Sequence, residues 1–493
     1  MMKSLQFFLI LIVLSVISTP VFAQDSFEEW KKQRQEQFQQ FKDERDAKFL
    51  EMLDEGWADF ASTQPAPSYA EPKLDDIPEA PERPRVGGNQ PSSPVIIDID
   101  LDLPDVELDT TPIDSPAPAA PPVNAPPGAE NASLDFYEVP VNYFYFRNQL
   151  VRLDGMPNEK SLQNYWADMS ETDYEPIVER LEQLREEISL NDWGYLSAVH
   201  KMAEDMYGTS GNSATLFTWY MMTKADYKMK LGYSGAEVYL LLPAQTRIYN
   251  TPFYTIDNER YYVASLDGSA QNPANIRTYA GSYPNADELV NLHIPNTPKV
   301  AESYLERELS FRYGDEVYSF SVPVNRNLIA FYEYYPHTDL PVYHNAKRSE
   351  QTRNALLRNL AGIIDGKDQV EAANILMRFT QTAFEYQTDT EQFKRQKYML
   401  PEETLYYPYS DCDDRAIMLA FLVDELLGLE VVGLLYPRHL ATAIKFDNPP
   451  SDGDMVRVGS DRYTIADPTY ILADVGATMP QFEGKTPEVI SLR

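Results

Sequence analysis

Cysteine, histidine and basic residues are scarce in this sequence. Its 493 residues include one cysteine and five histidines, and 42 Lys and Arg stand against 76 Asp and Glu, a formal net charge of −34. Such a chain is repelled by the phosphates of nucleic acids and by anionic lipid surfaces, which argues against nucleic-acid binding. One cysteine excludes an intramolecular disulfide, and the scattered histidines form no Cys/His cluster with structural-zinc spacing.

Long hydrophobic runs are also missing, apart from one at the start. Lys3 is followed by a mostly apolar stretch over residues 5–17 and then by small residues ending at Ala23, the pattern of a secretory signal peptide. This run is shorter than the ~20 residues that a transmembrane helix needs. We therefore expect residues 1–23 to be a signal peptide and the mature protein to be exported, periplasmic or extracellular, without a transmembrane segment.

Residues 24–62 are predicted to form an amphipathic helix. Large apolar side chains recur at eleven-residue intervals, which places them on one stripe of a nearly straight helix. The two series are Phe27, Phe38, Phe49 and Phe60, and Trp30, Phe41 and Met52. The stripe either packs on the protein's own body or mediates self-association or docking to an envelope partner. We favour a partner, because a long linker follows.

That linker is predicted over residues 63–133. The segment from Pro65 to Pro127 contains 16 prolines, and acidic residues dominate its charge. Such a composition buries too little apolar surface to offset the entropy of ordering, so an extended spacer is expected.

From Leu134 onward the composition is that of a folded protein of the α+β class. Helical periodicity predicts helices over 174–188, 194–206, 350–361 and 369–384, and alternation predicts strands over 237–242, 308–313, 316–322 and 327–332. We divide this part into an α+β domain at 134–270, a β-rich domain at 271–345 and a C-terminal domain at 346–493. Aligning Ser210 with Ser410 places Asn212 opposite Cys412, so residues 134–270 are either a degenerate copy of the C-terminal domain or an unrelated helix-then-strand arrangement.

The only cysteine begins the most informative segment. Apolar spacing after Cys412 predicts a buried helix capped by Ser410 and Asp413, which puts the thiol in its first turn. The N–H groups there favour a thiolate and can hold an oxyanion. His439 opens a predicted strand and Asp467 ends a later one, so the three residues fit a thiol triad. The alternative is a small buried cysteine with no chemical role.

The segment Gln381–Tyr470 resembles the transglutaminase-like superfamily, whose papain-type core carries Cys, His and Asp in this order. The resemblance implies Cys412 as nucleophile, His439 as general base and then acid, and Asp467 as the orienting carboxylate. It offers Tyr409 and Gln381 as candidates for the oxyanion donor. The acids Asp411 and Asp413 also resemble those with which exported bacterial transglutaminase-like cysteine proteinases bind calcium, and no other cofactor is implied.

The predicted function is that of an exported cysteine hydrolase, a peptidase or amidase acting on peptide or cell-wall amide bonds. Many members of the superfamily carry an aromatic residue two positions after the histidine, where this chain has Ala441. Because acyl transfer needs aromatic walls that exclude water, this difference favours hydrolysis. The alternatives are a protein-glutamine acyl transferase that cross-links proteins and a non-catalytic envelope scaffold. The expected partner is a protein or peptide substrate.

Overall fold

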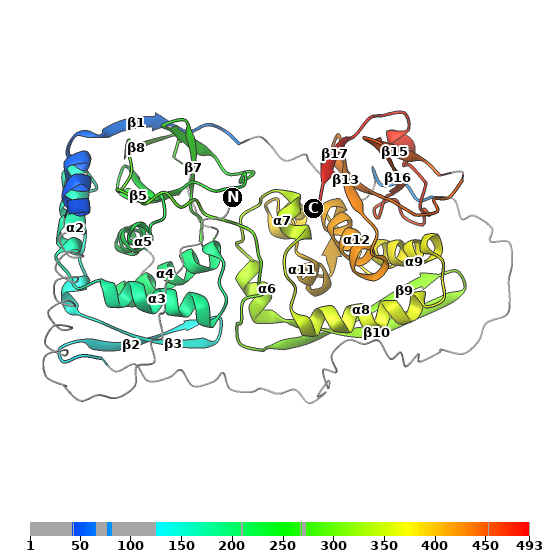
Figure 1. Cartoon of the computed structure of the whole chain (residues 1–493), viewed down its shortest axis with the longest axis horizontal. Coiled ribbons are helices and arrows are strands. Elements are labelled where there is room, and N and C mark those ends of the chain that lie inside the picture. The colour runs from blue at the N-terminus through cyan, green and yellow to red at the C-terminus, as the bar shows by residue number, and fades with distance from the viewer. Residues whose placement is uncertain are drawn as a thin grey trace, which may run out of the picture.

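The computed structural model describes residues 42, 44–65, 76–80, 125–208, 211–266, 268, 273–451 and 453–492. Helices and several sheets are mixed along the chain, which confirms the α+β class. The described elements form two lobes side by side along the long axis, with helix α6 (Arg326–Tyr332) between them (Figure 1). No helix within these residues has both the length and the apolar character needed to cross a bilayer.

The first lobe is built around a six-stranded sheet and the buried helix α5. The strands follow the order β1 (Trp57–Ala61), β8 (Asn275–Tyr279), β4 (Lys230–Ser234), β5 (Glu237–Leu242), β7 (Glu259–Val263) and β6 (Phe253–Ile256). The other elements are the hairpin β2 (Glu130–Phe136) and β3 (Val139–Tyr145) and the helices α2 (Glu159–Ser170), α3 (Glu175–Glu187), α4 (Asp192–Tyr207) and α5 (Asn212–Lys224). Helix α5 is apolar on nearly all sides, so it is buried between the sheet and α4 (Figure 1).

The N-terminal helix packs on this lobe. Within the described residues it spans 44–55, and Phe49 and Leu53 are each only 1% exposed. Asp46 accepts a hydrogen bond from the indole N–H of Trp166 at 3.1 Å and pairs with Lys224. Strand β1 replaces the end of the predicted helix 24–62 and pairs with β8. The described part of the apolar stripe, within residues 44–62, therefore packs on the chain's own body. Residues 24–41 lie outside the described residues, and self-association or an envelope partner stays a prediction.

The predicted linker and domain limits also differ from the structure. Thr63 forms a β-bridge with Phe253, residues 76–80 lie on the second lobe, and β2 already begins at Glu130, so the predicted spacer 63–133 contains ordered segments at both ends and in between. A boundary at 270 cuts the first sheet, because β8 pairs with both β1 and β4.

The second lobe carries a five-stranded sheet against helix α12. The strands follow the order β17 (Glu488–Ser491), β13 (Val431–Tyr436), β14 (His439–Ile444), β16 (Asp461–Ala466) and β15 (Met455–Val458). The helices are α7 (Leu340–His344), α8 (Glu350–Ile364), α9 (Gln369–Thr382), α10 (Asp389–Phe393), α11 (Pro401–Tyr406) and α12 (Cys412–Leu427). A long hairpin of β9 (Tyr304–Tyr313) and β10 (Glu316–Asn325) packs against α8 and α9 (Figure 1).

One strand prediction in this region is wrong, because residues 327–332 belong to helix α6. The Asn325 side chain accepts the N–H of Asn327 and so caps a helix at the end of β10. Both faces of this short helix are largely buried. Its sequence is therefore nearly continuously apolar, and in so short a segment such a run cannot be distinguished from a buried strand.

The two sheets have the same topology. In each lobe a helix leads into an antiparallel hairpin, two further strands extend the sheet beyond its second strand, and a last strand returns beside its first. The order β8-β4-β5-β7-β6 in the first lobe thus corresponds to β17-β13-β14-β16-β15 in the second, and all these pairings are antiparallel. Strand β1 is an addition to the first sheet.

Candidate active site

Cys412 is the first residue of α12, and its thiol is fully buried. The helix is capped one residue later than predicted: the Asp411 side chain accepts the N–H groups of Asp413 and Asp414, and Asp414 accepts the N–H of Asp411 in return. Ser410 instead accepts a hydrogen bond from the Arg415 guanidinium at 3.1 Å. The capping box fixes the thiol at the N-terminal end of the helix, where the helix dipole is positive.

His439 and Asp467 form a buried pair. The imidazole Nε2 lies 2.7 Å from Asp467 Oδ2, and the two side chains are 1% and 3% exposed. Strand pairing explains the meeting, because β14 runs antiparallel to β16 with Thr442 opposite Ala466, the residue before Asp467. The other ring nitrogen, His439 Nδ1, is buried and finds no hydrogen-bond partner in the described part of the chain.

The thiol lies on the helix that packs against the histidine's strand. Cys412 Sγ is 3.4 Å from Asp413 Oδ1, and in this conformation it makes no hydrogen bond to His439 Nδ1. Of the three predicted triad residues, His439 and Asp467 are therefore in direct contact, and Cys412 lies on the helix that packs against the strand of His439. Nucleophile and base are often separated in this way before a substrate binds.

An aromatic cover closes the histidine from one side. The Phe482 ring stacks on the imidazole with centroids 5.0 Å apart and planes 7° apart, and Tyr436 stacks on Phe482 in turn at 4.6 Å. Phe482 belongs to a short 3-10 helix, Pro480–Phe482, far beyond the segment that the sequence singled out. Sequence reasoning missed this residue because nothing in its local pattern distinguishes it from a core phenylalanine.

Gln381 supports the aspartate loop and is not available as an oxyanion donor. Its amide nitrogen donates to the carbonyl oxygens of Tyr470 at 2.8 Å, Ala473 at 3.1 Å and Asp467 at 3.4 Å, and its amide oxygen accepts from Arg378. These bonds hold the loop after β16 and so position Asp467. Tyr409 is half-buried on the two-residue strand β12 (Tyr409–Ser410), directly before α12.

Three buried carboxylates gather beside the thiol. Oxygen atoms of Asp389, Asp411 and Asp413 lie within 4.8 Å of one another, and each side chain is at most 2% exposed. The sequence indicated Asp411 and Asp413 but not Asp389, which arrives from the start of α10 and accepts the N–H of Lys397. An oxygen-only set of carboxylates matches the preference of Ca²⁺ for hard ligands.

Arg415 is the cation closest to this cluster along the chain. It is 1% exposed, donates to the Phe384 carbonyl at 3.0 Å and lies over the Tyr386 ring. Burial lowers the pKa of its guanidinium to about 10, against the opposing effect of Tyr386 and of the neighbouring acids, so Arg415 remains charged at neutral pH. One buried positive charge only partly offsets the carboxylates around the thiol.

The equivalent place in the first lobe has no nucleophile. Asn212 is the first residue of α5, as Cys412 is of α12, and Glu237 opens β5, as His439 opens β14. The Asn212 amide donates to the Ala236 carbonyl at 2.8 Å and accepts the N–H of Val238 at 3.1 Å, thereby spanning Glu237. In this lobe the first helical residue thus reaches the start of the second hairpin strand.

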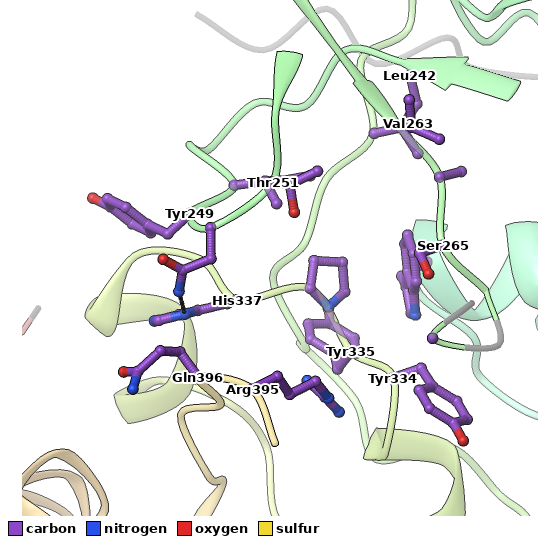
Figure 2. A pocket seen from close by; sticks show the side chains of 16 residues that line it. Leu242, Tyr249, Thr251, Val263, Ser265, Tyr334, Tyr335, His337, Arg395 and Gln396 are labelled. Carbon is purple, nitrogen blue, oxygen red and sulfur yellow. Dashed lines mark hydrogen bonds between the residues drawn. The ribbon is translucent and has the colours of Figure 1, made fainter. Parts of the chain in front are cut away.

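A separate pocket of about 240 Å³ lies where the two lobes meet. Figure 2 shows His337, Arg395 and Gln396 on one side and Val263 and Ser265 on the other. Asn250 Nδ2 lies 2.8 Å from His337 Nδ1, and burial lowers the pKa of His337 to about 3, so this imidazole is neutral. The pocket contains none of the predicted site residues, and its contacts join the first sheet to the second lobe.

Comparison with known proteins adds no family assignment: no protein-family model and no curated protein matches this chain.

Proposed function

We propose that this protein is an exported cysteine hydrolase, a peptidase or amidase whose residues 346–493 form a transglutaminase-like domain. The observation that carries the proposal is the His439–Asp467 pair at 2.7 Å, with Nδ1 of the same imidazole unengaged and the only cysteine at the start of the adjacent helix. A carboxylate that fixes one ring nitrogen leaves the other to accept the thiol proton.

The chemistry follows from these positions. His439 Nδ1 accepts the Cys412 proton, and the thiolate sulfur attacks the carbonyl carbon of a peptide or amide bond. The imidazolium then returns the proton to the leaving amine as the C–N bond breaks, which leaves a thioester on Cys412. Water, deprotonated by the same imidazole, hydrolyses the thioester and restores the thiol. Asp467 stabilises the imidazolium in both halves of the reaction.

The oxyanion donor in this proposal is Tyr409. Gln381 is engaged with three carbonyls, and the N–H groups of Asp413 and Asp414 are taken by the cap. Tyr409 lies three residues before the thiol and is half-buried, which leaves it the better of the two sequence candidates. Replacing Tyr409 with Phe should lower kcat more than it changes KM.

Calcium fits the carboxylate cluster. Asp389, Asp411 and Asp413 would hold the ion, whose charge would offset the buried acids and fix the start of α12. No other cofactor is part of the proposal.

We also propose that the first lobe is a degenerate copy of the second. The matching strand order supports it, as does the match of Asn212 with Cys412 as first helical residues. The strand registers agree as well: Leu241 pairs with Val263 where Ala443 pairs with Ile465, which places Ser265 opposite Asp467. This copy lacks both the nucleophile and the base.

Thiol reactivity tests the proposed function. We expect iodoacetamide to alkylate Cys412 faster than free cysteine near pH 7 once calcium is bound, and we expect His439→Ala to abolish this advantage. His293→Ala is the matched control, because His293 is an exposed histidine of the first lobe. Slow alkylation that is unaffected by His439→Ala would favour the non-catalytic scaffold.

Acyl transfer is the second candidate function, favoured by the burial of the triad and by the stacking of Phe482 on the His439 imidazole, since transfer to an amine requires the exclusion of water. Mass spectrometry decides between the two. Cys412-dependent incorporation of a primary amine into protein glutamines would show transfer, whereas cleaved amide bonds without amine incorporation would show hydrolysis.

A further inference from the structure

A short piece of the Pro-rich region lies on the second lobe. The backbone of Glu79 forms a parallel β-bridge with Ile471, and the Ala80 N–H donates to the Ile471 carbonyl at 2.8 Å. The side chains of Ile77 and Ala80 are partly buried against the apolar cluster that includes Tyr436 and Phe482. Residues 76–80 are therefore bound as an added extended segment, with a backbone contact and apolar anchors.

The surface beneath this segment is the outer side of the proposed active site. Ile471 lies four residues after Asp467, in the loop that Gln381 holds through the Tyr470 and Ala473 carbonyls. The cluster that receives Ile77 contains Phe482, which stacks on the His439 imidazole. Contacts thus run without a break from the bound segment to the catalytic histidine.

The same segment borders a large cleft. A cavity of about 1100 Å³ is lined by Ala80, by Tyr470 and Leu472 of the loop, and by Arg312 and Asp315 at the β9–β10 turn. This volume is large enough for several residues of a polypeptide, and its lining includes charged residues of both signs. A chain that follows the path of residues 76–80 would enter the cleft beside the aspartate loop.

We propose that this surface is a binding site for extended peptides and that residues 76–80 occupy it as an intramolecular competitor. The inference deepens the proposed function and rests on it, because it names an extended polypeptide as the substrate class. Backbone pairing to Ile471 binds a peptide with little regard to sequence, and the apolar cluster selects a hydrophobic side chain at the position of Ile77. A tethered segment competes at a high local concentration, so a substrate must displace it.

The burial of the triad is consistent with this arrangement. Cys412, His439 and Asp467 are 0%, 1% and 3% exposed, so a substrate reaches these side chains only if residues packed over them move. Ile77 packs on the cluster that contains Phe482, the residue that stacks on the His439 imidazole. Displacing residues 76–80 therefore frees the peptide site and loosens the cover over the histidine.

The test compares the full chain with a double variant, Ile77→Asp and Ala80→Pro, which introduces a charge into the apolar contact and removes the N–H that bonds Ile471. Glu79→Gln is the matched control, because its side chain is exposed and its backbone contact is kept. The first readout is the rate of Cys412 alkylation by iodoacetamide near pH 7. We expect at least a tenfold increase in the double variant and none in the control.

The second readout is binding of a fluorescein-labelled peptide with the sequence of residues 74–82, measured in the Cys412→Ala background so that no chemistry is needed. The double variant should bind it at least tenfold more tightly than the chain with an intact segment. Amide hydrogen exchange gives a check that needs no variant of the segment: the Ala80 N–H should be protected and should lose protection when excess peptide is added.

The outcomes separate this inference from the proposed function. Tighter peptide binding with an inert thiol in every variant would support the binding site and refute the hydrolase. Equal alkylation rates together with equal peptide binding would overturn the competitor even if the thiol is highly reactive. Faster alkylation without peptide binding would mean that residues 76–80 only cover the active site, and it would refute the peptide-binding site.

Discussion

Removing one carboxylate from the cluster should have opposite effects on stability with and without calcium. The perturbation is Asp389→Asn, which keeps an oxygen to accept the Lys397 N–H but removes one of three buried negative charges. Without a cation the variant relieves repulsion and should be more stable than the wild type. With calcium it has lost a charged ligand and should be less stable.

The magnitude follows from the spacing. Two unit charges 4.8 Å apart repel by about 3.5 kcal/mol at an effective dielectric constant of 20, and Asp389 faces two such neighbours. Arg415 and proton uptake reduce this repulsion, so we expect Asp389→Asn to raise the unfolding free energy in EGTA by at least about 1 kcal/mol. Calcium at 100 times its Kd should add about 2.7 kcal/mol to the wild type and much less to the variant.

Urea unfolding measures the unfolding free energies of the wild type and of Asp389→Asn, each in EGTA and in calcium. Asp365→Asn serves as the control, because Asp365 is an exposed acid of the same lobe outside the cluster. A wild type that is insensitive to calcium, or an Asp389→Asn variant that is destabilised equally in EGTA and in calcium, would refute the argument that these carboxylates form a cation site.

Three further predictions concern the packing around the site and between the lobes. The unfolded chain protonates His337 near pH 6.5 and the folded chain only near pH 3, so the unfolded state binds more protons between these values and the unfolding free energy decreases as the pH is lowered. Relative to His337→Gln, the wild type should lose about 2 kcal/mol between pH 7 and 5 in urea titrations. Phe49→Ala should lower the unfolding free energy of the first lobe by about 3–5 kcal/mol in urea, while Glu51→Ala, at an exposed position, should change it little. Equally small losses in both variants would mean that the N-terminal helix does not stabilise this lobe. Gln381→Leu should lower the unfolding free energy by at least about 2 kcal/mol and should slow Cys412 alkylation, because Asp467 is no longer held in position. An unchanged alkylation rate would show that the loop after β16 keeps its conformation without Gln381.

Much of the second lobe could be predicted from local patterns. The predicted strand that His439 opens matches β14, and the predicted helix after Cys412 matches α12. Asp467 lies in hydrogen-bond contact with His439. These elements have strong hydrophobic periodicity, and strands close in sequence often pair. The meeting of histidine and aspartate was therefore accessible from order and spacing, although β15 lies between β14 and β16 in the chain.

Contacts between distant segments could not be predicted in the same way. Asp389 joins the acids from 22 residues before Asp411, and Phe482 returns to His439 from the C-terminal region, with no sequence signal that names either contact. Within the described residues 44–55 the eleven-residue pattern matches an apolar helix face at Phe49 and Met52, but the pattern did not indicate what covers that face. The low-complexity composition of residues 63–133 concealed the docked segment 76–80, because two apolar contacts and one backbone bond do not alter a compositional average.

In the proposed function, the single thiol of an exported protein has to avoid oxidation as well as perform chemistry. Oxidising compartments convert accessible thiolates to sulfenic acid or mixed disulfides, and exposure and thiolate character both promote this loss. Here the thiol is fully buried and lies 3.4 Å from the carboxylate oxygen of Asp413, which disfavours a neighbouring negative charge on sulfur. In the proposed function calcium removes that electrostatic restraint, and a bound peptide removes the steric one by displacing residues 76–80. Cys412 would then be most nucleophilic and most accessible when both cation and substrate are present, which reconciles an acidic, closed site with cysteine chemistry.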